Sequence, residues 1–259
     1  MISRLRCFLG RTGCTTAKGS ALVPETSGTR GEAADDILIW TATLDRSEGE
    51  RAGWEAILSP DELARANRFH FVKDRNHFIV ARGLLRSLLG KYLHLEPASL
   101  EFAYGPYGKP ELSGASAVSG ASFNLAHSGG LAAYAISRRR NLGIDVERIQ
   151  AESAGEDIAR RYFSAREAGD LQTLPPEEKV AAFFRCWTRK EAYLKALGTG
   201  LQTPLDGFSV SLLPGQPAIF LNGATQDWHL ESFQPAEGYA GAVAYSGTPC
   251  AVHYLAVSS

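Results

Sequence analysis

The chain has 259 residues, 44% of them hydrophobic, which is enough for one large domain or two modest ones with buried cores. The formal net charge of −1, from 27 basic and 28 acidic residues, excludes a global attraction to nucleic acid or to a membrane surface. No apolar run approaches the ~20 residues of a membrane span. The four scattered cysteines exclude a disulfide framework and fit a reducing, cytoplasmic location.

Residues 1–34 differ in composition from the rest of the chain. They are rich in Gly, Ser, Thr and Arg, and no acidic residue precedes Glu25. This composition is typical of a disordered tail or of residues upstream of the true start, so we leave the segment out of the fold. An Arg-rich, acid-poor organellar presequence is the alternative interpretation.

From residue 35 the predicted elements come in the order strand, helices, strands. Ile37–Leu44 is a strand, and Ser59 as N-cap starts a helix within Leu58–Phe69. Apolar residues at 3–4 spacing predict a second helix over Asp74–Tyr92. Short strands follow, separated by Gly- and Pro-rich turns: Leu100–Tyr104, Ser122–Ala126 and Leu131–Ile136.

After the basic turn Ser137–Asn141 the same order of elements begins again. A strand at Leu142–Ile149 precedes three predicted helices, at Glu156–Phe163, from Ser164, and at Glu177–Leu197. Five further strands close the chain: Phe208–Leu212, Ala218–Leu221, Trp228–Phe233, Tyr239–Tyr245 and Val252–Val257. We therefore predict an α+β fold of two similarly ordered halves, residues 35–139 and 140–259.

A glutamate interrupts the apolar stripe of the helix predicted over Glu177–Leu197. At about 100° per residue, Glu191 falls on the same face as the large apolar side chains, with Lys190 and Lys195 on either side. A carboxylate placed where burial is expected costs free energy unless a partner offsets its charge. The chain should therefore contain such a partner.

The strand LGIDVERI at Leu142–Ile149 supplies further carboxylates. Its alternation places Asp145 and Glu147 on one face, about 6–7 Å apart along the strand. A half-exposed strand with polar side chains in water is the alternative. If the helix packs on this strand, three carboxylates converge with Glu191 and need a hard cation. Oxygen ligands in small number suit Mg²⁺, which also takes phosphate oxygens, so a metal–pyrophosphate site is expected.

Four motifs occur in an order that resembles a known family. They are GKP (Gly108–Pro110), FNLAHS (Phe123–Ser128), GIDVE (Gly143–Glu147) and WTRKEAYLK (Trp187–Lys195). Together they resemble the 4′-phosphopantetheinyl transferases, in the larger pseudo-dimeric class whose type member activates surfactin synthetase. The resemblance covers Ile37–Val257. It implies a pseudo-twofold fold with coenzyme A at the junction of the halves, and transfer of phosphopantetheine to a serine of an apo carrier protein.

The resemblance also implies roles for the matched residues. Asp145, Glu147 and Glu191 would hold Mg²⁺, with Mn²⁺ as the alternative, and Glu191 or Glu147 would act as general base. Lys195 would contact a phosphate and help the leaving group. The other residues expected to bind coenzyme A are Lys73, Arg75, His77, Tyr107, Gly108, Lys109, Pro110 and His127. The chain departs from the family at Ala126, where serine is common, and at Glu62, where a basic residue is common.

A monomer acting on an acyl or peptidyl carrier protein is expected, in fatty acid, polyketide or nonribosomal peptide synthesis. Arg160, Arg161, Tyr162 and Arg166 form a candidate receiving surface, with an ordinary amphipathic helix as the alternative. Two other functions remain open. One is a non-catalytic module that binds coenzyme A or carriers, and the other is a Mg²⁺ phosphohydrolase that splits coenzyme A with water.

Overall fold

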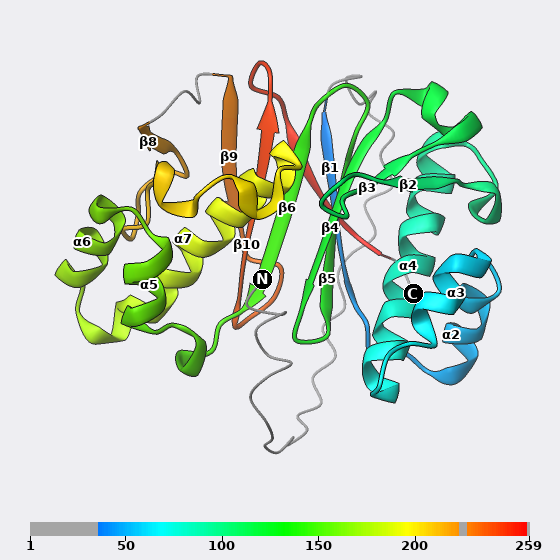
Figure 1. The fold of residues 1–259 in the computed structure, drawn as a ribbon, viewed down its shortest axis with the longest axis horizontal. Coiled ribbons are helices and arrows are strands. Elements are labelled where there is room, and N and C mark those ends of the chain that lie inside the picture. The colour runs from blue at the N-terminus through cyan, green and yellow to red at the C-terminus, as the bar shows by residue number, and fades with distance from the viewer. Residues whose placement is uncertain (1–35, 223–226, 258–259) are drawn as a thin grey trace. The chain divides into compact units, whose positions relative to one another are not determined.

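The computed structural model describes residues 36–222 and 227–257, and Figure 1 shows their arrangement. The described residues all belong to one compact unit. The prediction of a disordered tail or presequence over residues 1–34 lies outside the described residues. No helix in the described part of the chain is long and apolar enough to cross a membrane.

The first sheet has the strand order β11-β1-β5-β4. Strand β1 (Ile37–Thr43) pairs antiparallel with β5 (Leu131–Ser137), which pairs antiparallel with β4 (Ser122–Ser128). On its other edge β1 pairs in parallel with β11 (Val252–Ala256), the last strand of the chain. Within the described residues, strands far apart in sequence therefore meet in this sheet.

Three helices accompany this sheet: α2 (Glu48–Glu55), α3 (Pro60–Ala66) and the 22-residue α4 (Val72–Leu93). Apolar residues of α4, among them Leu85 and Leu89, share one core cluster with residues of β1, β4 and β5. Helices α2 and α3 pack against α4 rather than on the strands. Sequence reasoning missed α2, although Ser47 and Glu50 form a capping box at its start.

The second sheet is antiparallel, in the order β6 (Leu142–Arg148), β10 (Tyr239–Ser246) and β9 (Trp228–Phe233). The 22-residue α7 (Pro176–Leu197) packs on β6 and β10, and α5 (Glu156–Tyr162) and α6 (Ala165–Thr173) precede it in the chain. Figure 1 places α5–α7 and α2–α4 on opposite sides of the strands. Each half thus combines a sheet with one long helix, and the predicted α+β fold is confirmed.

Strands β4 and β6 lie side by side and join the two sheets through side chains. Asn124 accepts a hydrogen bond from the Ile144 amide at 2.9 Å, and the Ser128 hydroxyl accepts one from the Arg148 amide at 3.2 Å. Ile144 and Val146 enter a core cluster between the sheets. The opposite face of β6, with Asp145, is the face left for α7.

The remaining elements are short. They are β2 (Phe102–Tyr104), β3 (Pro110–Leu112), β7 (Ser209–Val210) and β8 (Phe220–Asn222), with 3-10 turns at Pro97–Ser99, Gly114–Ser119, Ala151–Ser153, Gly200–Gln202 and Leu205–Gly207. The strand expected at Phe208–Leu212 shrinks to two residues because its pairing with β8 has an irregular register there. Sequence reasoning also missed β3, whose first residue is a proline.

Candidate active site

The site begins where α7 crosses β6 at Gly143. A Cβ atom there would lie 2.2 Å from the backbone nitrogen of Ala196 and 2.3 Å from the carbonyl oxygen of Ala192. Only a residue without a side chain permits this approach of strand to helix. The crossing brings Glu191 and Lys195 of α7 to the face of β6 that carries its carboxylates.

Three carboxylates are buried at this crossing. Asp145, Glu147 and Glu191 retain only 4%, 5% and 7% of their accessible surface, so the half-exposed strand is ruled out. Lys195 forms an ion pair with Asp145, with Nζ 2.6 Å from Oδ1. The Ser128 hydroxyl donates to Oε2 of Glu147 at 2.6 Å. The predicted meeting of strand and helix therefore occurs, and a lysine is part of it.

The pKa shifts follow from burial and from the closeness of like charges. Burial, and next the charge of Asp145, raise the pKa of Glu147 to about 7. The same two causes raise the pKa of Glu191. Burial alone would lower the pKa of the Lys195 ammonium, but Asp145, then Glu191 and Glu147, raise it above its ordinary value. One ammonium thus faces three carboxyl groups.

Two carboxylate oxygens at the crossing are left without a partner. Oδ2 of Asp145 and Oε1 of Glu191 are buried and accept no hydrogen bond from the described residues. An unpaired buried carboxylate oxygen is costly, so an additional cation fits here. Within residues 36–222 and 227–257, no three His, Cys, Asp or Glu side chains form a ready-made metal cage. The oxygen-only donors and the two unpaired atoms fit a hard divalent ion such as Mg²⁺.

The lysine beside Glu191 points elsewhere, contrary to expectation. Nζ of Lys190 is 2.7 Å from Glu167 on α6 and donates to the Phe208 carbonyl at 2.6 Å, fully buried. Adjacent residues of a helix lie about 100° apart around its axis, so Lys190 faces α6 when Glu191 faces β6. The expectation that Lys190 flanks the acidic site is wrong.

Two arginines of α4 are paired with a buried carboxylate. Arg82 and Arg86 bind the two carboxylate oxygens of Glu62, with shortest distances of 2.6 and 2.7 Å, and all three side chains are buried. Glu62, a departure from the family pattern, therefore has a structural role that sequence reasoning missed. Its capping-box position in the first turn of α3 gave no sign of this long-range pairing.

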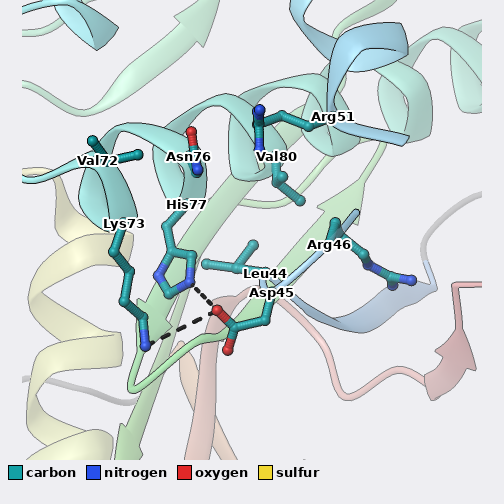
Figure 2. Close-up of a pocket in the computed structure, with 9 residues that line it drawn as sticks. All are labelled: Leu44, Asp45, Arg46, Arg51, Val72, Lys73, Asn76, His77 and Val80. Carbon is teal, nitrogen blue, oxygen red and sulfur yellow. Dashed lines mark hydrogen bonds and ion pairs between the residues drawn. The ribbon is translucent and has the colours of Figure 1, made fainter. Parts of the chain in front are cut away.

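A cavity of about 530 Å³ lies beside the start of α4. Figure 2 shows Lys73 and His77 directed toward Asp45. Oδ1 of Asp45 is 4.0 Å from Nζ of Lys73 and 2.8 Å from Nε2 of His77. The lining residues are Leu44, Asp45, Arg46, Arg51, Val72, Lys73, Asn76, His77 and Val80. Arg75 is absent from this lining, since it binds Glu55 at 2.6 Å. Asp45 and Arg46, which follow β1 after Leu44, were not expected here.

The β4–β5 turn connects this cavity with the carboxylates. A Cβ on Gly130 would lie 3.2 Å from Oδ2 of Asp45, while one on Gly129 would lie 2.7 Å from Cδ of Arg148 at the end of β6. His127, just before the turn, keeps part of its surface in solvent, but the protein atoms packed around its ring, and then the charges of Lys195 and His77, lower its pKa. His127 therefore lies near Lys195 at the crossing of β6 and α7 and near His77 in the cavity.

The segment Tyr107–Pro110 lies at the C-terminal end of α7. Nζ of Lys109 donates to the carbonyls of Leu142 at 3.2 Å and Ala196 at 3.1 Å. Tyr107 is half exposed, and Gly108 adopts a φ of 80°, a conformation that favours glycine. The two lysine contacts are with protein carbonyls.

The predicted carrier-binding residues lie on and after α5. Arg160, Arg161 and Arg166 are exposed, and Arg160 pairs with Asp157 at 2.5 Å. Tyr162 is half buried, with its ring 6.0 Å from that of Trp187 on α7. The arrangement leaves three guanidinium groups accessible over an anchored aromatic residue.

Comparisons with known proteins place this site in a family. Residues 46–139 match the model described as 4′-phosphopantetheinyl transferase, N-terminal, and residues 141–244 match that of the 4′-phosphopantetheinyl transferase superfamily. The 4′-phosphopantetheinyl transferase HetI of Nostoc sp. is 42% identical over 214 residues, which are 83% of this chain and 89% of that protein. The transferase Sfp of Bacillus subtilis is 31% identical, over 84% of this chain and 93% of that protein.

A solved holo-(acyl-carrier-protein) synthase from Bacillus anthracis is 23% identical, covering 42% of this chain and 96% of that chain, with a TM-score of 0.34. The two consecutive family matches and the near full-length relatives define an enzyme of phosphopantetheinyl transfer. The chain belongs to the 4′-phosphopantetheinyl transferase family, in its larger, Sfp-like class.

Proposed function

We propose that this enzyme moves the 4′-phosphopantetheine arm of coenzyme A onto a serine of an apo carrier protein, with Mg²⁺, releasing adenosine 3′,5′-bisphosphate. The observation that carries the proposal is the buried crossing of β6 and α7. There Lys195 faces three carboxylates, two of whose oxygens are unpaired, next to a cavity lined by basic residues. A divalent ion would match the carboxylates, and the phosphates of coenzyme A would match Lys195 and the basic residues of the cavity.

Asp145, Glu147 and Glu191 are the residues that would hold the ion, Mg²⁺ or alternatively Mn²⁺. A bound ion supplies charge neutralisation for the diphosphate and for the charge that develops on the leaving bisphosphate. The unpaired oxygens of Asp145 and Glu191 support this assignment. Binding of the ion would also offset the burial, and next the charge of Asp145, that raise the pKa values of the two glutamates.

The chain's other residues bind and orient coenzyme A. Lys195, accessible over 29% of its side chain, would exchange part of its contact with Asp145 for a phosphate of the leaving group. Lys73 and His77 would bind the 3′-phosphate in the cavity of Figure 2, with His127 on a phosphate nearby. Arg75, the third candidate of α4, holds Glu55 instead and supports the helix start. Segment 107–110 would run along the adenine.

A carboxylate takes the proton of the attacking serine. We favour Glu191 for this role, with Glu147 as the alternative, because a general base works best when its pKa approaches the working pH. Burial and Asp145 raise the pKa of both side chains. Glu147 already accepts a hydrogen bond from the Ser128 hydroxyl, whereas Oε1 of Glu191 accepts none from the described residues and is available to the serine.

The carrier protein would dock on the exposed arginines Arg160, Arg161 and Arg166, with Tyr162 among them. A positively charged surface with an aromatic residue suits an acidic protein partner. We propose that the enzyme acts as a monomer in the cytoplasm. The two cysteines in the described part of the chain, Cys186 and Cys250, are free thiols, which supports a reducing location.

One assay separates this proposal from its competitors. The enzyme is incubated with coenzyme A, Mg²⁺ and a panel of apo carrier proteins, and each carrier is weighed by mass spectrometry. A gain of one phosphopantetheine supports transfer and identifies the carrier. Release of bisphosphate with an unmodified carrier would indicate hydrolysis by water. Tight binding of coenzyme A without any product would indicate a non-catalytic module.

Glu191→Gln tests the acidic site directly. The variant keeps the size of the side chain but removes its charge, so we expect transfer to be abolished while the unfolding midpoint stays near that of the wild type. Glu177→Gln, at an exposed position in the first turn of the same helix, is the matched control and should keep full activity. Wild-type turnover by Glu191→Gln would remove Glu191 from the mechanism.

A further inference from the structure

Lys109 occupies an unusual place for a residue expected to touch a cofactor. Its ammonium lies between two protein carbonyls, Leu142 O on β6 and Ala196 O on α7. Desolvation lowers its pKa, with Glu111 opposing this in part. A lysine ammonium has three donors, and the two carbonyls take two of them, which leaves one for a ligand.

The two carbonyls lie beside Gly143, where β6 and α7 come into close contact. Leu142 precedes Gly143, whose missing side chain lets the backbone of α7 approach the strand. Ala196 is one of the α7 residues whose backbone lies against Gly143. The last carbonyls of a helix have no partner within the helix, and a cation there also offsets the negative end of the helix dipole. Lys109 thus ties the end of α7 to the start of β6.

The rest of the 105–110 turn rests on the same helix end. The aliphatic stem of Lys109 passes Gly198, where a Cβ would lie 3.5 Å from its Cδ, and Tyr107 lies against Gly200 with a corresponding distance of 3.1 Å. Both glycines have positive φ, 70° and 56°. Glycines at these places leave room for the turn to sit on the end of α7.

The other end of the hairpin is held by α4. Nη2 of Arg82 donates to the Tyr104 hydroxyl at 3.1 Å, and Tyr104 pairs with Pro110 across the hairpin. Within the turn, Gly105 donates to the Lys109 carbonyl at 2.9 Å. The turn is therefore fixed at both sides, and Lys109 provides its contact with the helix that carries Glu191 and Lys195.

We infer that Lys109 is a positioning residue, which holds the 105–110 turn on the crossing of β6 and α7 and acts on coenzyme A through the backbone of that turn. It would not contact the cofactor itself. Without its ammonium, the turn must be ordered by the ligand, so binding weakens equally for every ligand that uses the turn. The part of this inference that concerns coenzyme A rests on the proposed function, whereas the part that concerns the turn does not.

The first test needs no ligand. Lys109→Met keeps the length of the side chain and removes the ammonium, and hydrogen exchange is measured on the ligand-free enzyme. We expect faster exchange of the amides of Gly105 and Gly108 and of the last turn of α7. Lys91→Met, at an exposed position near the end of α4, should leave that exchange unchanged. Unchanged exchange in Lys109→Met would overturn the inference, whatever the enzyme catalyses.

The second test is kinetic and separates positioning from direct contact. In Lys109→Met we expect KM for coenzyme A to rise about tenfold or more, from two lost charged hydrogen bonds, with kcat within about twofold of wild type. KM for 3′-dephospho-coenzyme A should rise by the same factor, and Lys109→Arg should restore part of the loss. A rise confined to coenzyme A would mean that Lys109 contacts the 3′-phosphate, and the inference would be wrong. Wild-type enzyme without transfer activity would instead defeat the proposed function.

Discussion

Replacement of Gly143 by alanine tests whether the crossing of β6 and α7 sets the geometry of the site. The new Cβ would lie 2.2 Å from Ala196 N, 2.3 Å from Ala192 O and 2.7 Å from the carbonyl carbon of Lys195. All three are backbone atoms of α7, so no rotation of a side chain relieves the clash. The strand and the helix have to move apart.

The size of the effect follows from these distances. Non-bonded carbon contacts are normally about 3.5 Å or longer, so the two elements must separate by roughly 1 Å. Overpacking of a core costs about 1–3 kcal/mol where side chains can adjust, and a clash with backbone belongs at or above the upper end of that range. We expect a loss of about 3 kcal/mol in the free energy of unfolding. This is a large share of the roughly 5–15 kcal/mol that is typical of a domain. Because Asp145 moves away from Lys195, kcat should fall by more than about tenfold.

Urea unfolding followed by circular dichroism measures the first quantity, and the carrier mass assay measures the second. Gly53→Ala is the matched control, since nothing lies within 4 Å of its added Cβ and the residue is exposed within α2. That change should stabilise the protein by about 0.5–1 kcal/mol, because alanine favours the helix. A loss below about 0.5 kcal/mol in Gly143→Ala, together with normal turnover, would refute the reasoning.

Two further predictions concern the buried ion pairs. Burial would raise the pKa of Glu62, but Arg82 and then Arg86 lower it below the ordinary carboxyl value. The stabilisation from this pairing is therefore complete at pH values above the ordinary carboxyl pKa, and it is lost as the pH falls through the lowered pKa. Glu62→Gln should therefore cost about 3 kcal/mol or more at pH 7 and flatten the acid side of the stability profile in urea titrations; an unchanged profile would contradict this. Lys190→Met should cost about 3–5 kcal/mol, because Glu167 is left buried and charged, and adding Glu167→Gln should recover part of the loss. Equal stability of the single and double variants would show that the pair is not coupled.

Periodicity made much of the fold and part of the site predictable. Alternation along LGIDVERI placed Asp145 and Glu147 on one face, and the apolar stripe of the long helix placed Glu191 where burial follows. Both patterns are local, because side-chain direction repeats every two residues in a strand and every 3.6 in a helix. The strand at Trp228–Phe233 was predicted with its observed bounds for the same reason.

Contacts between distant segments were not predictable in this way. Lys190 and Lys195 both looked like flanks of Glu191, but only the position of α6 decides that Lys190 binds Glu167. The pairing of Arg82 with Glu62 likewise depends on the position of α3, which no local pattern in α4 shows. The helix α2 was missed for a different reason: it is only eight residues long and buries none of them fully, so it lacks the long apolar stripe that identified α4 and α7.

The parallel pairing of β11 with β1 affects how the chain can acquire its structure during synthesis. Ile37 meets Val252, which is far along the polypeptide, so this edge of the first sheet stays unpaired until β11 has left the ribosome. Such long-range pairing slows folding and leaves partly built sheets open to association with other chains. The sheet that contains β1, β5 and β4 thus depends on β11 to cover that edge.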